Sequence, residues 1–305
     1  MKRLLNYKYT SFSCIFAILY LKIFISTTKY LTFRFLLDKI TCMQAIEFKN
    51  KYGPYALVAG ASYGLGFAFS EAVAKRGLNL IMIARGKERL ESSAQLLRDI
   101  YNIEVITISE DLANYEVVKA QVDALDVAIG LLIYNAASCP IGKFNEKSDK
   151  DLIHAADINI KGPLLYTRLL CPKMIERKKG GIVLMASLAG TVGSPNIATY
   201  AATKAFNANL AEGLWKELKP YGIDVIGSCA GAILTENYKE AEKAKKAPGA
   251  LEPSVVAEKT LNALNKNKPI LVPGGTSKVA RFLFMRLMSR KSAVNTMAKS
   301  TKNLS

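Results

Sequence analysis

The stretch YALVAGASYGLGFAF, residues 55–69, decides which fold the chain is expected to adopt. It begins with a short apolar run, which is typical of a strand buried on both faces of a parallel sheet. Gly60, Gly64 and Gly66 come next, and a helical pattern continues to residue 76. Such a turn lets the backbone approach a pyrophosphate, and the amide groups at the helix start can bind it. The spacing G-x-x-x-G-x-G differs from the usual G-x-G-x-x-G, so the position directly after a buried strand carries the argument.

Outward from this stretch, apolar runs and helical patterns alternate along the chain. The predicted strands cover 55–61, 79–85, 104–109, 130–135, 181–187, 223–229 and 269–273. The predicted helices cover 64–76, 87–100, 114–127, 148–177, 198–219 and 253–266. Strict alternation indicates βαβ units with right-handed crossovers. We therefore predict an α/β fold with a doubly wound, seven-stranded parallel sheet.

Composition limits the possible classes of protein. The 305 residues suffice for one large domain, and half of them are hydrophobic. Of the net charge of +17, residues 1–42 hold +6 and residues 276–305 hold +7, which leaves +4 for residues 43–275. Basic ends suit an anionic membrane surface, and without a zinc-finger or RNA-binding signature we expect no nucleic acid partner. Five cysteines without a C-x-x-C pair, together with a single His, predict no metal site and a reducing, cytoplasmic location.

Residues 1–42 differ in character from the rest of the chain and are predicted to be a hydrophobic and basic extension. Residues 11–26 read SFSCIFAILYLKIFIS, which is shorter than the roughly 20 residues of a membrane span and contains Lys22. Three interpretations stay open: a membrane-associating anchor, a cleaved export signal, or a dispensable extension before Met43.

The residues after the second, third and fourth predicted strands bear on the cofactor. An NAD site usually places a carboxylate at the end of the second strand, but here Arg85 stands there, so a 2′-phosphate and NADP(H) are favoured over NAD(H). Asp111 and Leu112 end the third strand, where the adenine is expected. Asn135 and Ala136 end the fourth strand, at the floor of the crevice.

Four residues form the expected reacting set. Tyr200 and Lys204 are i and i+4 on one helix, and a nearby ammonium favours a phenolate, so Lys204 is predicted to lower the pKa of Tyr200. Ser187, at the end of the fifth strand, can hold the substrate oxygen against Tyr200. Asn159 can hold a water that links Lys204 to solvent. Tyr115 and Lys119 repeat the spacing without a strand-end serine, so we interpret that pair as a solvated helix face.

Over about residues 52–275 the chain resembles a short-chain dehydrogenase/reductase. The likeness rests on the turn from Gly60 to Gly66, Asp111-Leu112, the segment 135–137, Asn159, Ser187 and the run from Tyr200 to Lys204. It implies a Rossmann-type sheet, NAD(P)-linked oxidoreduction and homodimers or homotetramers. It also implies cofactor contacts from the turn residues Ser62, Tyr63 and Leu65, from Ile233 and Thr235, and from Tyr200 and Lys204. The segments 198–225 and 272–275 look most like a bacterial-type branch with unassigned substrates.

Three positions depart from the family pattern. Ala59 stands where Thr is usual, Ala137 where Gly is usual and Ala230 where Pro is usual. These changes bear on cofactor affinity and on the segment Thr235–Pro253, which we interpret either as a mobile lid or as a solvated surface helix. The reacting set itself is complete.

The expected organisation is an extension (1–42), a catalytic domain (43–275) and a basic amphipathic C-terminal helix (276–305). The expected function is hydride transfer between NADP(H) and a small, lipid-like or acyl carbonyl or alcohol substrate. The alternatives are a non-catalytic NADP(H)-binding sensor or scaffold, and a dehydratase or epimerase on the same fold. Membrane association through residues 11–26 is one of the interpretations that stay open.

Overall fold

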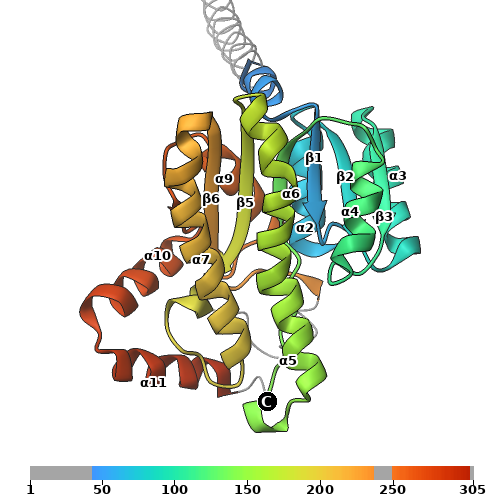
Figure 1. Cartoon of the computed structure of the whole chain (residues 1–305). Coiled ribbons are helices and arrows are strands. Elements are labelled where there is room, and N and C mark those ends of the chain that lie inside the picture. Colours follow the sequence, from blue (N-terminus) through green and yellow to red (C-terminus); the bar gives the residue numbers. More distant parts are fainter. Residues whose placement is uncertain (1–42, 237–248, 303–305) are drawn as a thin grey trace, which may run out of the picture. The chain divides into compact units, whose positions relative to one another are not determined.

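The computed structural model describes residues 43–236 and 249–302 (Figure 1). Two compact units divide the chain after Glu47, five residues later than the boundary expected at residue 42. Of the first unit, only residues 43–47 are described, and they are helical. The expected extension at 1–42, with its apolar stretch at 11–26, lies outside the described residues, as does most of the expected lid.

The second unit, Phe48–Ser305, contains a seven-stranded parallel sheet in the order β3-β2-β1-β4-β5-β6-β7. The strands are β1 (Tyr55–Ala59), β2 (Asn79–Ala84), β3 (Val105–Ser109), β4 (Ile129–Tyr134), β5 (Gly180–Ser187), β6 (Ile223–Ala230) and β7 (Ile270–Leu271). All pairs run parallel. The predicted doubly wound, Rossmann-type sheet is confirmed.

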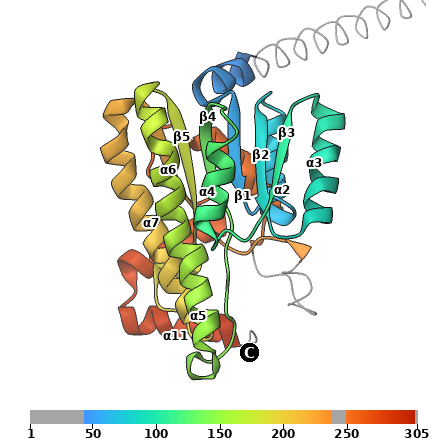
Figure 2. The ribbon, with the colours of Figure 1, turned by 45° about the vertical axis from the view of Figure 1, so that its right-hand side comes forward.

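Helices cover both faces of the sheet, as Figures 1 and 2 show. One face packs against α2 (Gly64–Ala74), α3 (Lys87–Tyr101) and α9 (Pro253–Ala263). The other packs against α4 (Tyr115–Asp123), α6 (Gly162–Glu176) and α7 (Ala198–Leu218). Alternate residues of one strand face opposite layers, so Val58 joins the first core and Leu57 the second. Both residues are fully buried, which explains why the strands read as continuous apolar runs.

The chain reverses direction across the sheet between β1 and β4. From β1 it moves outward through β2 to β3, and then returns to β4 on the other side of β1. Helices that come after β1 and β4 therefore diverge, which leaves a crevice at the carboxyl ends of these two strands. In open α/β sheets, ligands bind at such a switch point.

The helix predicted over 148–177 contains a π-turn. It consists of α5 (Asp149–Ala156), the π-turn η2 (Asp157–Lys161) and α6. The amide of Gly162 donates to Asp157, and the carbonyl of Ile158 instead accepts a 2.8 Å hydrogen bond from the hydroxyl of Tyr134. Any side chain at Gly162 would collide with that hydroxyl, since a Cβ there would lie 1.9 Å from it. The buried Tyr134 thus fixes the turn that contains Asn159.

The C-terminal segment is not the single helix that we expected from its periodicity. It forms α10 (Gly275–Phe282), a π-turn η5 (Leu283–Leu287) and a separate α11 (Arg290–Thr301). Met288 is extended, and the side chain of Ser289 caps α11 by accepting from the amide of Ser292. This capping serine starts a second helix, which turns back against the body of the unit.

Candidate active site

The glycine turn is closely packed at the carboxyl end of β1. Gly60 has a φ of +79°, and a Cβ there would lie 2.8 Å from the Cα of Ala136. A Cβ on Gly66 would lie only 1.8 Å from the carbonyl oxygen of Gly60. These positions therefore require glycine, because the turn, the helix start and the end of β4 come together there.

The start of α2 fits an anionic ligand. No side chain caps this helix, and its first turn contains no acidic residue. The positive end of the helix dipole is therefore not neutralised by the chain itself, which suits a phosphate group. Ser62 and Leu65 are buried in the turn, and the side chain of Tyr63 is exposed. These features fit a dinucleotide whose pyrophosphate lies at this helix start.

Asn135 and Ala136 support the turn from β4. Both of their amides donate to the carbonyl of Ala59, and the side-chain amide of Asn135 donates to the carbonyl of Gly60 at 3.1 Å. The side chain of Asn135 therefore braces the loop. The methyl of Ala136 fills the space beside Gly60, which makes this part of the crevice floor narrow.

At the ends of β2 and β3, a cation and a carboxylate face each other. Arg85 is largely exposed, and its guanidinium lies 3.8 Å from a carboxylate oxygen of Asp111. Asp111 also accepts from the amide of Ala113, whereas Leu112 is buried. An exposed ion pair of this length is weak, so Arg85 can turn toward another anion at small cost.

Arg89, which sequence patterns alone did not identify, is a second cation at this edge. Its guanidinium lies 4.5 Å from the centre of the Tyr63 ring and forms an ion pair with Glu236. Arg89 stands four residues after Arg85, in the first turn of α3. Arg85 precedes the helix, so helical spacing does not relate the two arginines, and the sequence alone contained no signal for Arg89.

The segment after β6 approaches the glycine turn from the opposite side. Ile233 pairs with Leu251, and a Cβ on Gly64 would lie 3.2 Å from the methyl of Thr235. Thr235 and Gly64, about 170 residues apart in the sequence, therefore lie in contact. The predicted cofactor residues of the two segments are brought together, although residues 237–248, between Thr235 and Leu251, are not described.

Tyr200 and Lys204 lie on one face of α7, beside the end of β5. The ammonium of Lys204 lies 5.5 Å from the centre of the Tyr200 ring, and donates a 2.8 Å hydrogen bond to the carbonyl of Met185. Lys204 is only 3% exposed, and this burial lowers its pKa to about 8. No carboxylate is paired with it in the described part of the chain.

The predicted lowering of the Tyr200 pKa by Lys204 is not what the geometry produces. Burial raises the pKa of Tyr200 to about 12, the nearby Cys139 adds to this, and a hydrogen bond with Ser187 opposes it. The reason is that Lys204 directs its ammonium to a backbone carbonyl and is itself desolvated. Ser187, at the end of β5, is thus the group that makes Tyr200 more acidic.

Asn159 is fully buried, and its amide joins two other parts of the site. Its oxygen accepts from the amide of Ser138 at 2.8 Å, and its nitrogen donates to the carbonyl of Ser138 and to the hydroxyl of Thr203. Both N–H groups are therefore occupied by protein partners. The predicted water between Asn159 and Lys204 stays a prediction, and the side chain itself fastens the loop after β4 to α7.

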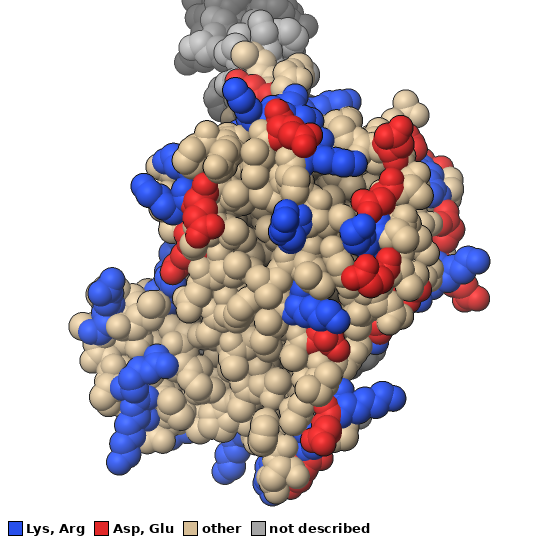
Figure 3. Space-filling view, viewed as in Figure 1, with Lys and Arg blue, Asp and Glu red and all other residues tan. Residues whose placement is uncertain are grey.

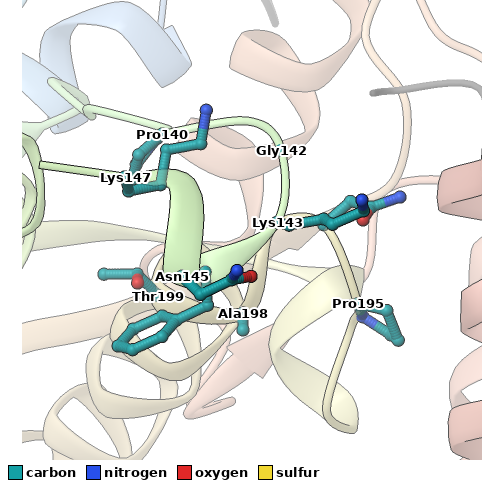
Figure 4. A pocket seen from close by; sticks show the side chains of 10 residues that line it. Pro140, Gly142, Lys143, Asn145, Lys147, Pro195, Ala198 and Thr199 are labelled. Atoms are coloured by element: carbon teal, nitrogen blue, oxygen red, sulfur yellow. The ribbon is translucent and has the colours of Figure 1, made fainter.

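A pocket of about 290 Å³ lies where that loop meets the start of α7 (Figure 4). Its walls include Lys143 and Lys147 from the loop and Thr199, which directly precedes Tyr200. The two walls are joined by a hydrogen bond from the amide of Gly142 to the carbonyl of Asn196. Lys143 pairs with Glu146, whereas Lys147 forms no ion pair in the described residues. The pocket is therefore bordered by two lysines, one of them without an ion-pair partner among the described residues, and by Thr199.

Sequence and structure comparisons agree with this geometry. A family model described as short chain dehydrogenase matches residues 54–246. A very-long-chain 3-oxoacyl-CoA reductase from Aspergillus fumigatus is 36% identical over 183 residues, which cover 57% of this chain and 52% of the relative. The chain thus spans about half the length of curated relatives that it matches.

Solved structures show the same fold. A 7beta-hydroxysteroid dehydrogenase has a TM-score of 0.75 at 23% identity, covering 82% of this chain and 98% of that one. A short-chain dehydrogenase from Sphingobium yanoikuyae in complex with NADPH has a TM-score of 0.67 at 26% identity, covering 78% and 97% of the two chains. The chain belongs to the short-chain dehydrogenase family.

The resemblance to a bacterial-type branch stays a prediction. As for membranes, none of the helices in residues 43–236 and 249–302 combines the length and apolar character that crossing a bilayer requires.

Proposed function

We propose that this chain is an oxidoreductase that reduces a carbonyl compound with NADP(H), reversibly toward the alcohol. The observation that carries the proposal is the meeting of Tyr200, Ser187 and Lys204 at the end of β5. It is supported by membership of the short-chain dehydrogenase family and by an uncapped glycine turn that suits a pyrophosphate.

Each reacting residue has a role that is explained by its surroundings. A nicotinamide held at the carboxyl ends of the strands would supply or accept the hydride. Tyr200, whose pKa is about 12, holds its proton at neutral pH and donates it to the carbonyl oxygen during reduction. Ser187 positions that oxygen and stabilises the phenolate by its hydrogen bond. Lys204, held by its hydrogen bond to the carbonyl of Met185, is proposed to contact the bound cofactor and not to set the pKa of Tyr200.

The preference for NADP(H) is also a proposal, and it rests on Arg85 and Arg89. No acidic residue stands at the end of β2, where one would bind a ribose 2′-hydroxyl, and two guanidinium groups lie at that edge instead. Guanidinium groups match a 2′-phosphate because they are planar and always charged. Asp111, Leu112, Ile233 and Thr235 remain proposed cofactor contacts.

For the substrate, we propose a 3-oxoacyl thioester or a similar apolar ketone with an anionic group. The Aspergillus fumigatus relative is named for a very-long-chain 3-oxoacyl-CoA substrate. The pocket beside Thr199 carries Lys143 and Lys147, which suit an anionic group. Together these observations support an acyl substrate over a small neutral one.

Two further expectations remain proposals. A homodimer or homotetramer is supported by exposed apolar residues on the helices beside the site, such as Ile153 on α5 and Leu164 on α6. Sedimentation velocity would test it. A cytoplasmic location with membrane association through residues 11–26 would be tested by fractionating the full chain beside one that starts at Met43.

A pair of matched variants tests the reaction. Tyr200→Phe is expected to lower the turnover of NADPH with a short 3-oxoacyl-CoA by roughly 10²–10⁴-fold. NADPH binding, measured by its fluorescence, should change little. Tyr115→Phe is the control, because Tyr115 belongs to the second Tyr-x-x-x-Lys pair, on α4, and packs on the ring of Tyr166.

Full activity of the Tyr200→Phe variant would reject this assignment. Tight NADPH binding by the unsubstituted chain, without oxidation by any thioester, ketone or aldehyde, would instead favour a cofactor-binding sensor or scaffold. A dehydrated or epimerised product would favour the third alternative.

A further inference from the structure

The helix α10 and the π-turn η5 expose large apolar side chains to solvent. Five such residues lie within nine positions, and their exposed fractions are 60% for Val279, 55% for Phe282, 38% for Leu283, 52% for Met285 and 67% for Leu287. We call Val279, Phe282, Leu283 and Leu287 the C-terminal apolar face. Single exposed apolar residues are ordinary on protein surfaces, but a contiguous set usually marks an interaction site.

The exposure of these side chains does not mean that the segment is unpacked. The same segment has an inner side, on which Ser277 and Phe284 are buried. Phe284 belongs to a small core with Val192, Ala293 and Met297, which fastens the segment to the loop after β5 and to α11. The orientation of the segment is therefore fixed by packing, and its second apolar side faces outward.

The charges around this face have one sign. Residues 276–305 contain seven basic and no acidic residues, and Lys278 and Arg286 are exposed beside the apolar side chains. Figure 3 shows Lys and Arg but no Asp or Glu over α10 and α11, at the lower left of the molecule. An apolar strip bordered by cations is complementary to an anionic lipid surface. Two copies placed face to face would bring like charges together, which disfavours a second copy as the partner.

We propose that the C-terminal apolar face inserts into the interfacial region of an anionic membrane, with α10 and η5 parallel to the bilayer plane. The segment of about 13 residues is roughly 20 Å long, too short and too charged to span a bilayer but suitable for lying in its surface. Arg290, just beyond the segment, donates to the carbonyl of Thr191 in the loop after Ser187. The face is thus joined to the loop that borders the site. This inference goes beyond the proposed reaction and does not depend on it.

A tryptophan placed in the face reports insertion locally. In the full-length chain, Phe282→Trp is mixed with vesicles of phosphatidylcholine and phosphatidylserine whose acyl chains are brominated near the headgroup. We expect the added fluorescence to fall by about half, because interfacial helices bury their apolar side about 5–10 Å deep. The unsubstituted chain gives the background of Trp215, which is the single tryptophan of the sequence.

The matched control is Leu96→Trp, since Leu96 is also an exposed apolar residue but lies on α3. Its fluorescence should not be quenched. The local readout matters because residues 11–26 could hold the chain on vesicles without any contact from α10. Cosedimentation with vesicles but no quenching at position 282 would therefore overturn the proposal, as would no binding at all.

A separate double variant tests the contribution of positive charge to membrane binding. Lys278→Gln with Arg286→Gln, in the Phe282→Trp chain, removes two charges that each favour an anionic surface by about fivefold. The lipid concentration for half-maximal quenching should rise roughly 30-fold. An unchanged concentration would overturn the anionic-membrane assignment. A lipid-independent dimer that Phe282→Asp abolishes would assign the face to a second copy and overturn it as well.

Discussion

The ammonium nitrogen of Lys204 lies 5.5 Å from the centre of the Tyr200 ring, one turn further along α7, and donates to the carbonyl of Met185. Burial shifts the pKa values of the two groups in opposite directions, because it disfavours the charged form of each. The pKa of Lys204 falls to about 8 and that of Tyr200 rises to about 12. The chain by itself therefore holds Tyr200 as a proton donor beside a lysine that titrates just above neutral pH.

The lowered pKa of Lys204 gives the stability of the chain a defined pH dependence. Above pH 8 the folded chain loses this proton, while the unfolded chain keeps it up to the ordinary value of 10.5. The unfolded state then binds more protons, so the free energy of unfolding rises with pH in this window. Between pH 7.5 and 9.5 we expect the free energy of unfolding of the unsubstituted chain to rise by about 2 kcal/mol relative to Lys204→Met, since one pKa unit corresponds to about 1.4 kcal/mol. Urea titrations of the two proteins across this pH range measure the difference. Parallel curves of unfolding free energy against pH would contradict the prediction.

Ser187 is expected to set the acidity of Tyr200. Oxidation of an alcohol needs the phenolate, and the hydrogen bond from Ser187 is the contact that opposes the effect of burial on the Tyr200 pKa. Ser187→Ala should move the pKa seen in kcat/KM for alcohol oxidation upward and lower the rate at neutral pH by roughly 10²-fold. Ser187→Thr keeps a hydroxyl and should restore the pH profile. If the alanine variant loses rate without any shift of its profile, the serine acts only by positioning the substrate.

Arg85 and Arg89 are expected to distinguish the two cofactors. Alanine at either position removes a cation from the edge where a 2′-phosphate is proposed to bind, so KM for NADPH should rise about tenfold or more, as the loss of a charge-assisted hydrogen bond implies. KM for NADH should change little. Lys173→Gln, in the last turn of α6 and at the opposite edge of the sheet, is the control for a general loss of positive charge. Equal increases for the two cofactors would show that the arginines only shape the site.

Those features of the fold that depend on sequence neighbours could be predicted. The strands are continuous apolar runs because helices cover both faces of the sheet. The ends of these runs therefore lie close to the observed ends of the strands. Ser187 and the glycine turn could be placed at one edge because the carboxyl ends of parallel strands meet there. For the same reason, the i, i+4 pair Tyr200 and Lys204 could be assigned to one helix face.

Features that depend on distant contacts could not be predicted. In the π-turn at Asp157–Lys161, the partner of the Ile158 carbonyl is the hydroxyl of Tyr134, more than 20 residues earlier. The position of Arg89 depends on the ring of Tyr63 and on Glu236, and the direction of Lys204 depends on Met185. Periodicity contains no information on such partners. The pKa of Tyr200 was mispredicted for that reason. We expected the ammonium of Lys204 to act on the Tyr200 hydroxyl, but it donates to the backbone carbonyl of Met185 instead.

Asn159 is expected to contribute more to stability than to proton transfer. Asn159→Ala removes three hydrogen bonds and leaves the amide and carbonyl of Ser138 without their side-chain partner. Leaving buried polar groups unsatisfied costs about 1–3 kcal/mol, so the free energy of unfolding should fall by that amount. Asn114→Ala removes only a surface hydrogen bond to Glu110 and serves as the control. Loss of turnover with unchanged stability would instead support the predicted water relay.

The glycine turn can be tested with two glycines that differ in their surroundings. A Cβ at Gly66 would lie 1.8 Å from the carbonyl oxygen of Gly60 and 2.8 Å from the side-chain nitrogen of Asn135, so neither the turn nor its brace can stay in place. Gly66→Ala should lower the free energy of unfolding by about 1–3 kcal/mol and weaken NADPH binding, since the helix start must move away from the turn.

At Gly86, which precedes α3, a Cβ would meet nothing within 4 Å, and its φ of −83° suits any residue. Gly86→Ala should therefore stay within about 0.5 kcal/mol of the unsubstituted chain, as surface substitutions usually do. Thermal unfolding and NADPH fluorescence measure both effects. Equal behaviour of the two variants would mean that the close packing at Gly66 does not hold the cofactor turn.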